Sequence, residues 1–233
     1  MISPVRCLEH LTQGASTLKS SGAPEGIHDI RISIARLRVW LSLGGWHVLD
    51  DDLRWLRDEA APSRDLDVQL GMHPPAGWAR ELRRRRAEAR GRLLRALGDP
   101  RMKSLLSALA SLPPVPLGAA RREARRLSRR ALSLGKKTPF RSADVEPIHR
   151  LRRSVRRVRF ALEWLCEDAS EVKSLQDALG EVCDRANVLR SLDDPSVVGI
   201  KRYRRKLSLE LGRASREARA TWKRTRRALE ALL

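Results

Sequence analysis

Hydrophobic and basic positions alternate with helical spacing along residues 149–164, which read HRLRRSVRRVRFALEW. On a helix of about 100° per residue, one side carries only apolar residues. These are Leu151, Val155, Val158, Leu162 and Leu165. Four arginines, Arg152, Arg153, Arg156 and Arg159, gather within about 80° of His149 on the opposite side. The pattern therefore predicts a helix that packs through one face and presents a row of guanidinium groups beside an imidazole.

A second stretch of the same kind begins at His28, 121 positions before His149. Arg31, Arg36 and Arg38 accompany this histidine, and an apolar side backs them. That side consists of Ile30, Ile34, Leu37 and Leu41. The following segments also correspond, because 53–56 lies 119 positions before 172–175 and 64–67 lies 119 before 183–186. We expect an internal duplication whose halves are related by a pseudo-twofold arrangement.

Leu, Ala, Arg and Glu dominate between joints rich in proline and glycine, which predicts an all-α fold. The predicted helices span 4–19, 24–44, 50–70, 78–112, 118–134, 143–166, 170–192 and 197–233. A bend is possible at Pro62 and a break at Gly98-Asp99-Pro100. The two prolines of Leu112-Pro113-Pro114 cannot continue a helix. We therefore predict two four-helix bundles, residues 1–112 and 117–233.

The charge balance indicates a polyanionic partner. There are 48 Lys and Arg against 28 Asp and Glu, a net charge of +20, with a sequence pI near 11.4. Such an excess repels itself in a compact protein, and arginine forks suit phosphate oxygens. The alternative is that these charges are only the solvated faces of arginine-rich helices.

Membrane insertion and secretion are not expected. No stretch approaches 18 uncharged apolar residues, and the N-terminus lacks the pattern of a signal peptide. The three cysteines show no CxxC spacing, which favours a reducing cytoplasm. Cys166 and Cys183 stand at helical positions and are expected to be buried.

The paired motifs resemble the CHAD family, whose name stands for conserved histidine α-helical domain. IHDIRISIARLRVW and IHRLRRSVRRVRFALEW are similar to the openings of its two repeats, and LRWLRDEAAPSRDLDV and VKSLQDALGEVCDRANVL to the helices that follow. The resemblance covers essentially the whole chain and implies two four-helix bundles around a central basic groove or pore that binds inorganic polyphosphate. No segment resembles the CYTH triphosphatase domain that often accompanies this family, so we expect a stand-alone CHAD protein.

The candidate polyphosphate-binding residues combine the two histidine helices with cations of the helices that follow. They are His28, Arg31, Arg36, Arg38, Arg54, His149, Arg152, Arg153, Arg156, Arg157, Arg159 and Lys173. Ala35 stands where the resembled family has an arginine, whereas the second copy keeps Arg156 there. The second half is therefore expected to contribute more.

The histidines and acidic residues leave alternatives open. The arginines around His28 and His149 disfavour protonation, and each neutral ring is expected either to bond phosphate or to pack at the wall of the groove. No His or carboxylate stands three or four positions after either ring, so we predict no metal site and no cofactor. Asp65, Asp67, Asp177 and Asp184 are interpreted as carboxylates that orient guanidinium groups, rather than as acids for hydrolysis.

Three functions compete. The first is non-enzymatic polyphosphate binding in the cytoplasm, with targeting to polyphosphate granules. The second is nucleic-acid binding by a nucleoid-associated protein, which the charge supports although only nine aromatic residues are present. The third is an enzyme acting on phosphate polymers, and we predict no catalytic residues because neither a Walker loop nor a nucleophile–base pair is found. The oligomeric state is left open.

Overall fold

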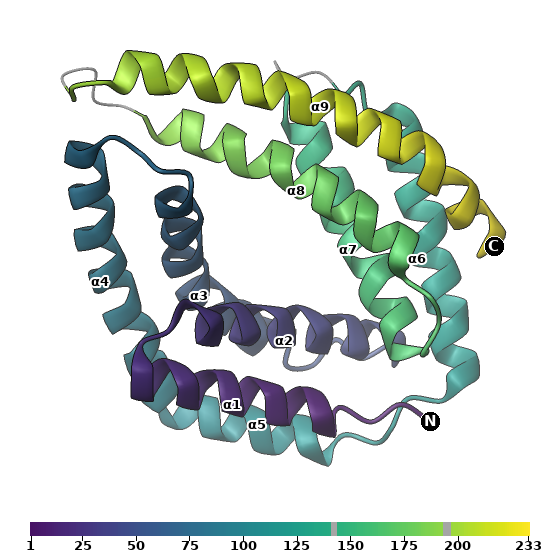
Figure 1. Cartoon of the computed structure of the whole chain (residues 1–233). Helices are drawn as coiled ribbons and strands as arrows, with labels where there is room; N and C mark the ends of the chain where they lie inside the picture. The colour runs from purple at the N-terminus through teal and green to yellow at the C-terminus, as the bar shows by residue number, and fades with distance from the viewer. Residues whose placement is uncertain (141–143, 193–196) are drawn as a thin grey trace. The chain divides into compact units, whose positions relative to one another are not determined.

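The computed structural model describes residues 1–140, 144–192 and 197–233. Within these ranges the chain forms nine α-helices, and its β structure is one isolated antiparallel bridge between Ile2 and Val115. The all-α fold is therefore confirmed (Figure 1). The chain divides into two compact units, Met1–Ala119 and Ala120–Leu233.

The first unit is built from five helices. They are α1 (Val5–Ser21), α2 (Pro24–Leu43), α3 (Asp50–Gly71), α4 (Ala76–Gly98) and α5 (Pro100–Ser111). Consecutive helices from α1 to α4 pack against each other, and α5 contacts α1, α3 and α4. The apolar side predicted for α2 forms much of the core, with exposures of 1% or less. It consists of Ile30, Ile34, Leu37 and Leu41.

The first unit has one helix more than predicted, because the helix expected over 78–112 divides at Asp99. Asp99 adopts an extended backbone, as residues before proline prefer, and Pro100 starts α5. The Asp99 side chain accepts a hydrogen bond from the Arg101 amide at 2.8 Å, which caps the new helix. At Pro62, in contrast, α3 continues as one helix.

Helices α1 and α2 approach each other closely at two glycines. A Cβ atom built on Gly26 would lie 2.7 Å from the Gly14 carbonyl oxygen and 2.8 Å from the Leu18 amide nitrogen. Because both neighbours are backbone atoms, neither can move aside without shifting a helix. The contact therefore depends on the absence of a side chain at Gly26.

The second unit contains α6 (Leu117–Lys137, which begins three residues before the unit boundary), α7 (Glu146–Trp164), α8 (Ser170–Ser191) and α9 (Ile200–Ala231). Helix α8 packs between α7 and α9. The predicted start of α7 at Ala143 and the predicted joint at 193–195 lie outside the described residues.

The two cysteines expected to be buried differ. Cys183 is buried in α8, as predicted, but the prediction for Cys166 is wrong because its side chain is exposed. Helix α7 ends at Trp164, two residues before the predicted end, and Cys166 has a positive φ of 56°. Cys166 therefore lies beyond the helix and does not follow the apolar face.

Candidate functional site

Helix α7 is held in the second unit by its apolar side. Leu151, Val155 and Val158 are fully buried, and Leu162 is 2% exposed. Leu165, after the last residue of the helix, is half-buried. The arginines emerge on the other side, where Arg153 is exposed and the other predicted arginines are half-buried. The burial pattern therefore matches the two faces read from the sequence. The half-buried arginines are Arg152, Arg156, Arg157 and Arg159.

The arginine three positions after each histidine contacts the next helix in the chain. Arg152 crosses α8 at Gly180, where an added Cβ would lie 3.4 Å from Nε of Arg152. That Nε is buried and has no hydrogen-bond partner among the described residues. In the first unit, Arg31 donates to the Ala61 carbonyl oxygen of α3 at 3.1 Å. Arg31 is thus hydrogen-bonded to the backbone of the following helix, whereas Arg152 lies against a glycine of the following helix.

His149 is paired with an arginine that the sequence did not indicate. Its Nε2 lies 3.1 Å from Nη2 of Arg190, near the end of α8. Burial lowers the pKa of His149 below its ordinary value, Arg190 lowers it further, and Glu146 opposes the shift. The neutral ring can accept from Arg190 through Nε2 and retain a donor at Nδ1. The predicted direction is confirmed, but burial is a larger cause than the arginines.

The two histidines differ in their surroundings. His28 is exposed on α2, whereas His149 is half-buried on α7. The matching position for Arg190, 119 residues earlier, is occupied by Gly71. Comparison of the two repeats therefore could not have identified Arg190.

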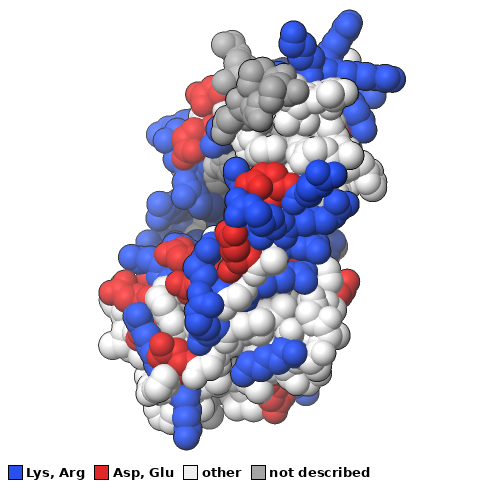
Figure 2. All heavy atoms as spheres, turned by 90° about the vertical axis from the view of Figure 1, so that its left-hand side faces the viewer, with Lys and Arg blue, Asp and Glu red and all other residues white. Residues whose placement is uncertain are grey.

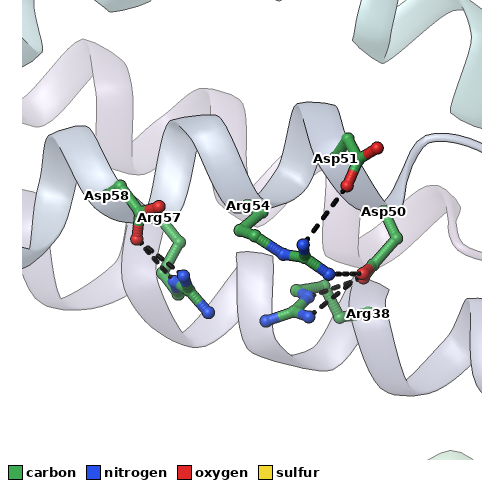
Figure 3. A network of polar contacts seen from close by, with 6 residues as sticks. All are labelled: Arg38, Asp50, Asp51, Arg54, Arg57 and Asp58. Atoms are coloured by element: carbon green, nitrogen blue, oxygen red, sulfur yellow. Dashed lines mark hydrogen bonds and ion pairs between the residues drawn. The ribbon is translucent and has the colours of Figure 1, made fainter.

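In the first unit, a carboxylate network engages two of the predicted cations (Figure 3). Asp50 accepts from Arg38 at 2.7 and 3.2 Å and from Arg54 at 2.8 Å. Arg54 also lies 3.4 Å from Asp51. The hydrogen bond from Arg38 is the main cause that lowers the pKa of Asp50. Sequence reasoning missed Asp50, since an acidic residue in the first turn of a helix is common for other reasons.

Cations of the second unit also have acidic neighbours. The Arg159 side chain is largely enclosed, with 14% exposed, a 2.7 Å bond to Glu163 and its guanidinium over the Phe160 ring. Lys173 lies 2.7 Å from Asp177 on the exposed surface of α8. Exposed pairs of this kind are weak and can exchange for another anion. Arg159 thus takes part in packing as well as in an ion pair.

Carboxylates interpreted from the sequence as orienting groups do contact cations. Asp65 lies 3.2 Å from Arg31, and Asp67, whose side chain is 5% exposed, lies 3.3 Å from both Arg86 and Arg90. Asp184 is half-buried in α8. Within the described parts of the chain, no group of three or more His, Cys, Asp or Glu residues is arranged to hold a metal ion.

Of the remaining predicted residues, Arg36 lies on α2 close enough to Cys7 of α1 to affect its thiol. Burial raises the pKa of Cys7 to about 11, and the charge of Arg36 partly opposes this rise. Cys183 behaves similarly in the second unit, where burial raises its pKa to about 11 and Arg152 opposes the rise. Both thiols are therefore protonated at neutral pH and function as small buried side chains.

Residues 5–193 match the CHAD domain family. The chain belongs to the CHAD family. Its fold is similar to the crystal structure of the CHAD domain from the plant Ricinus communis, with a TM-score of 0.76 and 20% identity, over 94% of this chain and 89% of that one. It is also similar to PptA from Streptomyces chartreusis, with a TM-score of 0.62 and 16% identity, over 100% and 99% of the two chains. Among curated proteins, none matches this chain.

The surface of this CHAD protein is strongly basic. On the face drawn in Figure 2, Lys and Arg side chains cover more of the surface than Asp and Glu, which lie among them. In the described ranges of this CHAD protein, no helix has the length and apolar character needed to cross a membrane.

Proposed function

We propose that this CHAD protein binds inorganic polyphosphate, without catalysis, through the arginine-rich surface that α7 and α8 form in the second unit. The observation that carries the proposal is the His149–Arg190 pair, which lies beside Arg152 and Arg153. The association of the CHAD family with polyphosphate and the net charge of +20 support the choice of ligand.

The chemistry of this surface suits a repeating anion without bases. Arginines one helical turn apart rise by about 5.4 Å, which places successive forks along the axis of α7. Each fork can donate two hydrogen bonds to phosphate oxygens, and Nδ1 of neutral His149 can add another. Recognition of this kind depends on charge and spacing and needs no sequence readout.

We infer that the first unit binds more weakly, because its carboxylates compete with the ligand. Asp50 engages Arg38 and Arg54, and Asp65 engages Arg31. Ala169 stands in the second unit at the position that matches Asp50, 119 residues later. The second unit therefore has no carboxylate at the position of Asp50, and an incoming phosphate would compete there with more exposed pairs such as Arg153–Glu146 at 3.4 Å.

Binding can be measured by fluorescence anisotropy with labelled long-chain polyphosphate. The test variant combines Arg153→Gln, Arg156→Gln and Arg190→Gln, which remove three charges from the proposed surface. The control variant combines Arg122→Gln, Arg125→Gln and Arg129→Gln, which remove the same charge from exposed positions of α6.

We expect the affinity of the test variant to fall by at least about tenfold, equivalent to about 1.4 kcal/mol, and that of the control variant to change little. Equal losses in the two variants would show that net charge alone binds the polymer. Wild-type affinity in the test variant would place the site elsewhere.

Two further measurements separate this function from its alternatives. If duplex DNA displaces polyphosphate at equal phosphate concentration, nucleic-acid binding is the better assignment. Release of orthophosphate from polyphosphate in the presence of Mg²⁺ or Mn²⁺ would contradict binding without catalysis. For the proposed targeting to polyphosphate granules in the cytoplasm, a fluorescent fusion should lose granule association in the test variant and keep it in the control.

A further inference from the structure

The outer side of α9 has a row of basic side chains along almost its whole length. Its opposite side packs on α8 and is buried through residues such as Leu207, Leu211 and Trp222 (Figure 1). On a helix of about 100° per residue, six exposed cations lie within about 40° of the middle of the outer side. They are Arg202, Arg205, Arg213, Arg216, Lys223 and Arg227, which we call the α9 row. The α9 row extends over about 38 Å of helix.

The acidic residues of α9 lie beside the α9 row and not within it. Glu210, Glu217 and Glu230 are 3.8, 3.7 and 3.3 Å from cations that flank the row. Among the residues that the structure describes, none forms an ion pair with a member of the row. All six charges of the row are therefore available to an external anion.

The α9 row is divided into three pairs of cations. Leu209 and Ala220 lie on the same side of the helix and occupy the two gaps between the pairs. At a rise of 1.5 Å per residue, the midpoints of successive pairs are about 16 Å apart along the axis. On α7, in contrast, Arg152, Arg156 and Arg159 follow at single helical turns. The α9 row therefore matches an anion whose phosphates come within reach at longer intervals.

Duplex DNA presents its phosphates at such intervals. Each strand crosses a given side of the duplex once per turn of about 34–36 Å, so a backbone is met on average about every 17–18 Å. The persistence length of DNA, about 50 nm, keeps this spacing over the whole length of α9. A flexible polyphosphate chain would have to lose conformational freedom to follow the row. The spacing therefore favours a rigid duplex.

A lipid surface matches the α9 row less well. Helices that lie on membranes insert an apolar face below the headgroups. The apolar face of α9 is buried within the second unit, and Leu209, 62% exposed, is the one large apolar side chain exposed among the described residues of this helix. The outer side of α9 therefore offers charge without an apolar surface to insert.

We propose that the α9 row binds the sugar-phosphate backbones of duplex DNA without reading its base sequence. Each pair of cations contacts one backbone crossing, and the binding energy comes from phosphate contacts and released counterions. None of the residues assigned above to polyphosphate binding belongs to the row. Because the row faces away from α8, DNA on it leaves the surface of α7 and α8 uncovered.

A variant that moves charges without removing any tests the spacing. The changes Arg213→Gln, Arg216→Gln, Leu209→Arg and Ala220→Arg empty the middle pair and fill the two gaps, all at exposed positions. Fluorescence anisotropy of the full chain with a labelled duplex of about 20 base pairs, near two turns, measures the affinity. We expect a loss of at least about tenfold at 0.1 M salt, because two phosphate contacts are lost. Unchanged affinity would show that charge alone binds DNA and would overturn the proposal.

A second pair of variants removes charge. Arg213→Gln/Arg216→Gln should make the slope of log affinity for the duplex against log salt concentration shallower by about 2. Arg125→Gln/Arg129→Gln removes the same charge from exposed positions of α6 and should keep the wild-type slope. Equal changes in the two variants contradict a defined row. Single-stranded DNA of the same length should bind less tightly than the duplex, and equal affinity for both also contradicts the proposal.

The site is distinguished from the polyphosphate surface by exchanging ligands and variants. The variant with Arg153, Arg156 and Arg190 changed to Gln should keep its affinity for the duplex, and Arg213→Gln/Arg216→Gln should keep its affinity for polyphosphate. Loss of duplex binding in the first variant overturns the proposal, as does tighter binding to phosphatidylserine vesicles than to the duplex at equal phosphate concentration. A failure of polyphosphate binding leaves the result with DNA unaffected, so the two proposals fail separately.

Discussion

His149 joins burial, charge and hydrogen bonding in one side chain. Its half-buried position removes water from the ring, and Arg190 supplies a donor at 3.1 Å together with a positive charge. Both effects favour the neutral imidazole, and Glu146 opposes them. The pKa of this histidine therefore depends on how closely α7 and α8 pack at the proposed surface.

We expect NMR titration to give a pKa for His149 below the ordinary value of about 6.5. The substitution Arg190→Gln should raise this pKa without restoring it fully, because burial, the largest cause, remains. The signal can be assigned by its loss in His149→Gln, and Arg205→Gln serves as a control that keeps the wild-type value. An unchanged pKa in Arg190→Gln would contradict the contact.

The same shift has a consequence for stability. Because the pKa of His149 is lower in the folded protein, the unfolded chain takes up a proton first as the pH falls below about 6.5. The free energy of unfolding attributable to His149 is therefore complete above that pH and is lost as the pH falls through the folded pKa. His149→Gln should remove this part of the pH dependence from denaturant unfolding curves.

At the scale of elements, most of the fold prediction depended on helical periodicity. Which residues of α2 and α7 face the core depends only on local spacing, so Ile34 and Val155 could be placed from the sequence. The break at Asp99 could also be predicted from the sequence, because proline disfavours the helical backbone conformation of the residue before it. Cys166 was misplaced because the last turn of a helix depends on tertiary contacts as well as on pattern.

The site was less accessible to sequence reasoning than the fold. The contact between His149 and Arg190 joins residues 41 positions apart on two helices, and Gly71 stands 119 positions before Arg190. Likewise, Asp50 reaches Arg38 only because α3 folds back along α2. Helical spacing identifies the face on which a cation lies, but its partner on another helix depends on how the helices pack.

The contact between α1 and α2 gives a prediction at the same scale. Gly26→Ala should lower the free energy of unfolding by about 1–3 kcal/mol, the usual cost of overpacking, because the new methyl group meets backbone atoms. Gly91→Ala in α4 is a suitable control. Its added Cβ meets only the end of the flexible Arg95 side chain, at 3.7 Å.

The control should raise the free energy of unfolding by about 0.5–1 kcal/mol, since alanine favours the helix over glycine. Chemical denaturation of both variants followed by circular dichroism measures the difference. Equal stability of Gly26→Ala and the wild type would mean that the two helices can separate at low cost.

At the scale of the whole molecule, the excess of basic residues governs how binding responds to salt. A protein that neutralises phosphates releases condensed counterions, so the affinity of the wild type for polyphosphate should fall steeply as salt is raised. The slope of log affinity against log salt concentration counts the contacts. For duplex DNA it is about 0.9 for each phosphate neutralised.

We therefore expect the variant with Arg153, Arg156 and Arg190 changed to Gln to have a slope shallower by about 2–3. The α6 variant with Arg122, Arg125 and Arg129 changed to Gln should keep the wild-type slope. Anisotropy titrations at several salt concentrations provide the measurement. A slope that changes equally in both variants would indicate a diffuse charge effect without a defined surface.

Because of the network around Asp50, we expect the two halves of the chain to bind oligophosphate with different affinities. Under the proposed function, a short oligophosphate that reaches Arg38 and Arg54 must displace the Asp50 carboxylate, whereas the matching position in the second half is Ala169. Titration with triphosphate should then proceed in two phases, the first at low ligand concentration and the second at high. Exchanging Asp50 for Asn would bring the two phases together.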